Sequence, residues 1–452
     1  MSGLGTFLAS ILPMPSSWNG FDQQHGNLKN CKRLLAQPFF WASLCFLGYI
    51  LIQYLNPSIV QVFDEKSWWV EPMTPPLGAN LPFSVKADYS TMNALRTFVI
   101  QTSAISLACG ILVGIKRRKT GLIILWSFVT SGVTMGMVAI LQKLSGAQKL
   151  LWIAETLNPN PWGTFSYRNQ AAAFLILTTI ISCLLYFYFL NKCRSSNKSI
   201  NNGGPHYLCL LYVFLLFASI WLALSRGGII IGGALALAFS ILVFLKKDSY
   251  VLLIRNNGGS FLLFGLLFFC GVLFVTQLSD WNAIDKRIQH FKDIKENVEI
   301  YDRTLSAKAT WDMAQDSLLF GWGGGSFRYI FPIYQKNYET IWYHWKSKKR
   351  GWQGRRIYHY AHNDWLQFLA EYGAMGCFFL SGMFLCLVIP AIRLCAFAKS
   401  EGFLILIGIS LIFIHNFVDF IFSSPAYWVA FFGSFFLIMR LYNLEHSIRK
   451  YN

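Results

Sequence analysis

The stretch "YHYAHNDWLQFLAEYGAMG", residues 358–376, lies where a polar part of the chain gives way to a long apolar part. It begins with aromatic and ionisable side chains, including His359 and His362, and continues as a hydrophobic run to about residue 390. Such a run exceeds the ~20 apolar residues that a helix needs to cross ~30 Å of hydrocarbon. The stretch therefore predicts a membrane helix with polar side chains at its threshold.

Similar apolar runs recur along all 452 residues. The chain is 54% hydrophobic and 13% charged, whereas a soluble domain carries about 25% charged residues. Only helices or closed barrels satisfy backbone hydrogen bonds in a bilayer, and these runs lack the alternation of barrel strands. We therefore expect an all-α polytopic membrane protein with about ten transmembrane helices. The expected spans are 38–55, 93–115, 120–141, 169–190, 207–225, 227–245, 258–277, 363–390, 402–422 and 427–442.

The distribution of Lys and Arg predicts the orientation of these spans. Basic clusters such as 116–119 fall on alternate connections, which the positive-inside rule assigns to the cytoplasm. The first span would serve as an uncleaved signal, and both termini would be cytoplasmic. The expected organisation begins with a cytoplasmic N-terminal segment, 1–37, followed by helices one to seven within 38–277, with outer loops at 56–92 and 142–168. A large outer loop, 278–361, carrying active-site elements, comes next. Helices eight to ten lie within 363–442, and a cytoplasmic tail, 443–452, ends the chain.

The outer loop 278–361 is too long to be a simple connector. Loops of this length are usually functional, disordered or structured in their own right. Within it, "YDRTLSAKATWDMAQDSLLFGWGGGSF" (301–327) predicts a helix of about 14 residues with Asp302 as its N-cap, ended by a Gly-rich turn. The turn lacks the Gly-Lys-Ser/Thr ending of a phosphate-binding loop, so we expect it to serve close backbone approach.

Arg226 is the most informative charged residue. It lies in "WLALSRGGIIIGGALAL" between two apolar segments, and no Asp or Glu occurs between residues 156 and 247. A charge at membrane depth costs about 2.5–3.5 kcal/mol on insertion scales, which favours a functional role. Arg226 could bind an anion through its forked donors, or it could extend to the interface at a tight helical turn.

Three further arginines are candidates of the same kind. Arg303 would begin the helix of the large loop, where the helix dipole disfavours a cation, and this local conflict is compatible with a binding residue. Arg168 lies at the mouth of the fourth span, and Arg287 lies in "DKRIQ". For each of them, a solvated surface arginine is the alternative.

His362 has two possible placements. On a helical wheel it groups with Trp365 and Leu366, so it either faces the packed side of the helix or precedes the helix. It could be a structural histidine, or a neutral imidazole that accepts a proton from a hydroxyl. The nearby strip 342–360 alternates aromatic with basic residues. On an outer membrane face this strip would contact phospholipid headgroups, phosphorylated glycolipids or sugars, or it would be a solvated loop.

Neither a metal site nor a disulfide is expected. All ten cysteines fall in spans or on the predicted inner side, and no acidic pair has the spacing of a divalent-cation site. The spans themselves carry almost no charge, which argues against a polysaccharide transporter or flippase, because transporters place ionisable groups near the midplane.

Several motifs in order resemble one family. They are "SRGG" (225–228), the segment 301–327 with its Arg, Trp and Gly-rich turn, "HNDWLQFLAEYGAMG" (362–376) and "HNFVDFIFSSPA" (415–426). Together they look like the bacterial O-antigen ligase and O-antigen polymerase superfamily. The resemblance covers about residues 160 to 430.

The resemblance implies a C-type glycosyltransferase-like fold, with the loop 278–361 in the periplasm and the enzyme in the bacterial inner membrane. It implies metal-independent transfer, without a cofactor, of a glycan from a polyprenyl-diphosphate carrier to a glycolipid or glycan acceptor. The catalytic histidine of the family corresponds to His362 and its two essential arginines to Arg226 and Arg303, with Arg168 and Arg287 as additional substrate-binding candidates. We expect an inverting O-antigen ligase, with an O-antigen or exopolysaccharide polymerase and then a protein O-oligosaccharyltransferase as alternatives, and no nucleic-acid partner.

Overall fold

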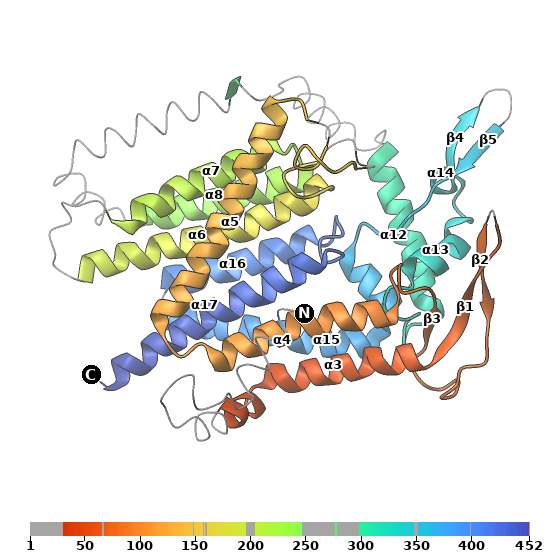
Figure 1. The fold of residues 1–452 in the computed structure, drawn as a ribbon, viewed down its shortest axis with the longest axis horizontal. Coiled ribbons are helices and arrows are strands. Elements are labelled where there is room, and N and C mark those ends of the chain that lie inside the picture. Colours follow the sequence, from red (N-terminus) through yellow and green to blue (C-terminus); the bar gives the residue numbers. More distant parts are fainter. Residues whose placement is uncertain are drawn as a thin grey trace. The chain divides into compact units, whose positions relative to one another are not determined.

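The computed structural model describes residues 30–65, 67–147, 149–156, 158, 161–195, 204–245, 276–277, 298–347, 351–397 and 399–451. Over these residues the chain is mainly helical (Figure 1). Eight of the described helices are long and apolar enough to cross a membrane, and a shorter apolar helix covers 400–415. The expected all-α polytopic membrane fold is therefore confirmed. The expected span 258–277 lies outside the described residues except for its last two positions.

The chain divides into two compact units. Unit 1 comprises Met1–Arg117, Asp293–Leu387 and Asn416–Asn452, and unit 2 comprises Arg118–Lys292 and Val388–His415.

Four helices form the apolar part of unit 1: α3 (Pro38–Leu55), α4 (Ala94–Gly114), α15 (Asp364–Phe397, in unit 1 as far as Leu387) and α17 (Pro425–Tyr451). Proline at the first turn favours the start of α3, and the Asn93 side chain caps α4 by accepting a hydrogen bond from Arg96 N at 2.8 Å. Helix α4 packs on both α3 and α17. Aromatic rings fill the bundle, with Phe39 lying 4.3 Å from Phe436 between ring centroids.

The segment 56–92 contains a sheet that the sequence analysis did not predict. Its strands are β1 (Pro57–Phe63), β2 (Trp68–Pro72) and β3 (Ser84–Lys86), in the order β2-β1-β3. β1 pairs antiparallel with β2, with Val60 opposite Glu71, and parallel with β3.

The large loop also folds onto unit 1. It contains α12 (Val298–Asp316), α13 (Phe327–Gln335), α14 (Glu339–Trp342) and a hairpin of β4 (Tyr343–Ser347) and β5 (Gly351–Arg355). These elements gather at the end of unit 1 that carries the sheet (Figure 1). They share one apolar core with residues of β3 and of α15, including Val85, Met313, Phe331, Ile341 and Ala370. The loop is thus a folded part of the unit.

Two boundary predictions are wrong. Helix α12 begins at Val298, four residues before Asp302, so Asp302 is not an N-cap. The span expected to reach residue 422 ends at His415 in α16 (Lys399–His415). The residues after it leave helical geometry because their backbone groups bond elsewhere: Asp364 N donates to Asn416 O at 2.9 Å, and Phe422 N donates to the Asp364 carboxylate at 2.8 Å.

Unit 2 is an apolar helical bundle of α5 (Arg118–Leu144), α6 (Arg168–Ser195), α7 (Pro205–Leu222), α8 (Arg226–Leu245) and α16. Helix α6 packs against all four of the others and is largely buried. Small residues allow this close packing. A Cβ atom added at Gly132 of α5 would lie 2.6 Å from Thr178 Oγ1 of α6.

Candidate active site

The Gly-rich turn of the large loop inserts into a break in α15. Helix α15 loses helical geometry at Gly373, with φ 62° and ψ −175°. The turn fills the break: Trp322 N donates to Ala370 O at 2.9 Å, and Ala374 N donates to Leu318 O at 2.7 Å. Gly321 has φ +68°, and a Cβ there would lie 2.4 Å from Glu371 O. Close backbone approach, as expected from the sequence, is therefore confirmed as the role of this turn.

The amide groups of the turn bind a carboxylate of the same chain. Gly325 N donates to Glu371 Oε2 at 2.9 Å, and Phe327 N donates to Oε1 at 3.3 Å. The Gln367 side chain also donates to Oε1, at 3.1 Å. Glu371 is 5% exposed. Backbone amides in such a concavity can bind phosphate, but here Glu371 occupies them.

His362 lies just before α15 rather than within it. Asn363 is the N-cap, since its Oδ1 accepts a hydrogen bond from Leu366 N at 3.1 Å. His362 has φ +55°, in the left-handed region that non-glycine residues seldom adopt. Its ring packs edge-on against Phe420, with 4.7 Å between centroids. Of the two placements open to the sequence analysis, the structure has the one before the helix.

One ring nitrogen of His362 is available for chemistry. His362 Nδ1 is buried and has no hydrogen-bond partner among the described residues. Burial, and secondarily the positive charge of Arg303, lowers the pKa of His362 to about 3. The imidazole is therefore neutral near pH 7. A neutral imidazole can accept a proton from a bound hydroxyl.

Arg303 lies beside His362 in unit 1. It occupies the second turn of α12, and its Nη1 donates to Val418 O at 2.9 Å. Because α12 begins at Val298, Arg303 is beyond the first turn, and the expected conflict with the helix dipole does not arise. The side chain is partly buried. It places a fixed positive charge close to the neutral imidazole.

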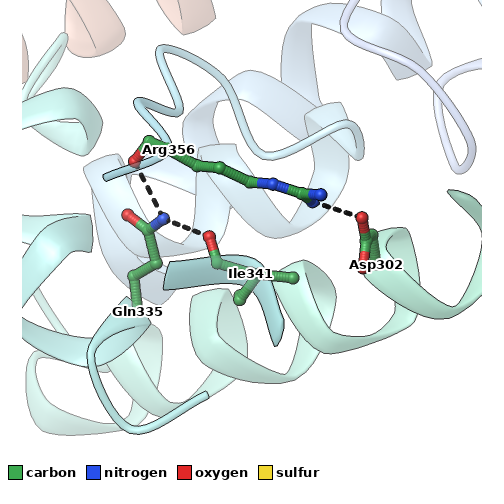
Figure 2. Close-up of polar contacts among 4 residues, drawn as sticks. All are labelled: Asp302, Gln335, Ile341 and Arg356. Atoms are coloured by element: carbon green, nitrogen blue, oxygen red, sulfur yellow. Dashed lines mark hydrogen bonds and ion pairs between the residues drawn. The ribbon is translucent and has the colours of Figure 1, made fainter. Parts of the chain in front are cut away.

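An ion pair supports the helix segment that carries Arg303. Asp302 pairs with Arg356, which follows β5, as Figure 2 shows. The Gln335 side chain donates to both Arg356 O, at 3.1 Å, and Ile341 O, at 2.7 Å. Burial alone would lower the pKa of Arg356, but the hydrogen bonds and charges of Asp302 and Tyr358 together outweigh burial and raise that pKa. These contacts hold α12, α13 and the end of the hairpin together.

Unit 1 also contains a pocket, and every residue that lines it belongs to this unit. Arg328, His359 and Tyr360 line it together with Thr97 and Gln101 of α4. Burial, with the charge of Arg328, lowers the pKa of His359. The sequence analysis did not single out Arg328, because an arginine after a Gly-rich turn carries no distinctive local signal.

Arg226 lies in unit 2 and begins α8. Ser225 Oγ accepts a hydrogen bond from Gly228 N at 3.1 Å, which caps the helix. A Cβ at Gly227 would lie 2.6 Å from His415 Nε2, and a Cβ at Gly228 would lie 2.6 Å from Ala172 Cβ. The two glycines therefore allow α8 to approach α16 and α6 closely.

The other arginine candidates divide as follows. Arg168 begins α6, also in unit 2, and the first turns of α6 and α8 are in contact through Ala172 and Gly228. Arg287 lies outside the described residues. The structure thus groups His362 with Arg303 in unit 1 and Arg168 with Arg226 in unit 2. Within the described part of the chain, no group of three or more His, Cys, Asp or Glu side chains could hold a metal ion.

Comparison with known families finds one match, which covers most of the candidate site residues. Residues 211–381 match the family model of O-antigen ligase. The match supports the resemblance to this superfamily that the sequence motifs indicated. The matched segment contains Arg226, Arg303, Arg328, His362 and Glu371, whereas Arg168 precedes it. No curated protein matches the chain.

Proposed function

We propose that this protein is an O-antigen ligase of the bacterial inner membrane that acts on the periplasmic face. It would move a glycan from a polyprenyl-diphosphate carrier to a hydroxyl of a glycolipid acceptor. One observation carries the proposal: in a segment that matches the O-antigen ligase family, His362 presents a neutral ring nitrogen that has no hydrogen-bond partner in the described part of the chain, within reach of the charge of Arg303.

The reaction would be a direct displacement. Nδ1 of His362 takes the proton of the acceptor hydroxyl, and the hydroxyl oxygen forms a bond to the anomeric carbon. The bond from that carbon to the diphosphate oxygen breaks, and the polyprenyl diphosphate leaves with the electron pair. Attack opposite to the leaving group inverts the anomeric centre.

The arginines would stabilise the leaving group. Preorganised positive charge aimed at a developing negative charge is usually the largest catalytic contribution, and guanidinium groups match phosphate oxygens through paired donors. Arg303 and Arg226 would supply this charge, with Arg168 and Arg287 as further contacts, and transfer would need no divalent metal.

Donor binding would also prepare the base. The charge of Arg303 contributes to the low pKa of His362. A diphosphate bound at Arg303 would offset that charge and raise the proton affinity of the imidazole. His362 would therefore be a stronger base in the complex with the donor than in the free enzyme.

The substitution His362→Ala tests the proposal. General base catalysis contributes about 10²–10⁴-fold, so single-turnover transfer should fall by that factor while donor binding persists. The assay uses the purified protein with lipid-linked donor, in excess chelator, with lipid A core or a second lipid-linked repeat as acceptor. The matched control is His344→Ala, since His344 lies exposed on β4.

Each arm has a clear meaning. Transfer to the lipid A core identifies a ligase, and transfer only to the lipid-linked repeat identifies a polymerase. Near-normal transfer by folded His362→Ala protein would overturn the mechanism. Loss of transfer in chelator, restored by magnesium or manganese, would contradict the role given to the arginines.

A further inference from the structure

The pocket beside His362 is not used by the proposed displacement. Helix α4 lines one side of it with Thr97 and Gln101, and α13 contributes Arg328. Phe420 connects it to the base, because its ring stacks on Tyr360 at 4.8 Å between centroids and meets His362 edge-on. Tyr360 lines the pocket, whereas Phe420 and His362 do not, so the ring of Phe420 relates the pocket to the proposed base.

The wall formed by α4 carries unsatisfied hydrogen-bond acceptors. Thr97 is 4% exposed and Gln101 is 2% exposed. Thr97 Oγ1 and Gln101 Oε1 have no hydrogen-bond partner among the described residues. A buried polar atom left without a partner costs free energy and requires an explanation. Hydroxyl groups of a bound molecule could donate to both atoms.

The lining also carries the positive charge of Arg328, which interacts electrostatically with the Glu371 carboxylate. The described residues provide no ion pair or hydrogen bond to the Arg328 guanidinium, whose Cζ lies 5.9 Å from the centroid of the Tyr360 ring. Asp364 and Glu371 also line the pocket, but their carboxylates bind backbone amides of Phe422 and Gly325. The guanidinium therefore remains able to bind an external anion through its paired donors.

Aromatic rings complete the lining. Phe368, Phe422 and Trp428 line the pocket and pack against one another, with 4.2 Å between the centroids of Phe422 and Trp428. Such rings present flat apolar surfaces on which the C–H face of a sugar ring can rest. The pocket thus combines apolar faces, hydroxyl-binding oxygens and one cation.

We infer that this pocket binds one acidic sugar residue of the acceptor. Gln101 and Thr97 would accept hydrogen bonds from its hydroxyls, and Arg328 would bind its carboxylate or phosphate group. The sugar would lie against Tyr360, and the acceptor would extend past Phe420 to bring its reacting hydroxyl to His362. The acceptor role rests on the proposed function, whereas the chemistry of the bound sugar rests on the pocket alone.

Ligand-observed NMR on the full-length protein in detergent can test the inference. The probes are glucose, glucose 6-phosphate, glucuronate and inorganic phosphate. We expect both acidic sugars to bind about tenfold more tightly than glucose, equivalent to about 1.4 kcal/mol. Arg328→Gln should reduce them to the level of glucose, and Arg328→Lys should keep part of the preference. Gln101→Leu should weaken all three sugars.

Matched variants control for general effects. Lys336→Gln removes one exposed charge just after α13, and Ser103→Ala removes a hydroxyl that bonds Val99 O within α4. Both should leave the affinities unchanged. His362→Ala should retain them too, so sugar binding can be measured whether or not transfer occurs.

The outcomes separate the two proposals. The same affinity for glucose and the acidic sugars, or full preference in folded Arg328→Gln protein, would overturn the inference. Inorganic phosphate that binds as tightly as glucose 6-phosphate would identify a plain anion site and would also overturn it. The expected pattern in a protein that transfers no glycan would support the sugar site while refuting the proposed function.

Discussion

Arg303 and Arg226 are both candidate anion-binding arginines, but different interactions hold them in place. Arg303 projects from α12, whose position depends on the Asp302–Arg356 ion pair and the Gln335 hydrogen bonds. Arg226 begins an apolar helix that is fixed by contacts between small residues, with Gly228 against Ala172. The comparison teaches that the position of a candidate arginine can depend on charge in one unit and on close packing in the other. Changes in packing should therefore displace Arg226, and changes in charge should displace Arg303.

Among the changes that test this comparison, Gly228→Ala should have the largest effect. Its new Cβ would overlap Ala172 Cβ, and overpacking of this kind costs typically about 1–3 kcal/mol. A shift of about 1 Å in a positioning group can reduce rate by about 10²-fold, so transfer should fall by that order. Thermal unfolding and transfer rate should both report the change. Gly233→Ala is the control, because no atom lies within 4 Å of its added Cβ. Wild-type stability and transfer in Gly228→Ala would show that packing does not position Arg226.

A smaller effect is expected from Asp302→Asn. Loss of the ion pair should weaken the attachment of Arg356 to α12. The transfer rate should then fall by about tenfold, which corresponds to an activation free energy higher by about 1.4 kcal/mol. The loss should be larger in kcat than in donor affinity, and exchanging the two residues (Asp302→Arg with Arg356→Asp) should restore part of the rate. Glu155→Gln, which breaks the exposed Lys149–Glu155 pair, should have no effect. Equal effects from both substitutions would remove any special role for the Asp302 pair.

The smallest effect concerns pH. The pKa of His362 is about 3 in the free protein, below its ordinary value, so the imidazole stays neutral as pH falls and protonates only in strong acid. The acid limb of kcat/KM should therefore lie well below pH 6.5. Arg303→Gln should move that limb to higher pH, since one cause of the depression is removed, while burial keeps it below 6.5. Lys308→Gln, an exposed change on the same helix, is the control. An unmoved limb in Arg303→Gln would show that the two groups are not coupled.

The same depression has a consequence for stability. Because the unfolded chain binds a proton at His362 near pH 6.5 and the folded chain does not, folding weakens as pH falls from about 6.5 toward 3. Above pH 6.5 this histidine contributes no pH dependence to folding.

Composition and apolar run length were sufficient to predict the membrane fold. The expected spans that lie within the described residues are helices, because a helix satisfies its own backbone hydrogen bonds in a bilayer and ~20 apolar residues suffice to cross it. The motifs around Arg226, Arg303 and His362 were also visible, since charge beside apolar sequence is a strong signal. The roles of these residues in transfer stay predictions.

Long-range partners explain what the sequence did not reveal. Asp302 is of a residue type that often caps helices, but its carboxylate forms an ion pair with Arg356, 54 positions away. Glu371 lies in a long apolar run, and its carboxylate accepts a hydrogen bond from an amide of a turn 46 positions earlier. The strands β1 to β3 pair residues across a Pro-rich segment, and no local periodicity specifies their register.

The break in α15 has a consequence for the order of assembly during synthesis. The Gly-rich turn is completed by Gln53 of α3, which donates to Phe320 O at 3.0 Å, and by Glu371 of α15. Contacts that distant in sequence form late, because closing long loops costs entropy before the contacts stabilise anything. The turn leaves the ribosome before the helix that receives it, so its amides stay unfilled until α15 has emerged. Emergence of α15 would thus be the event that completes the folding of a domain made earlier.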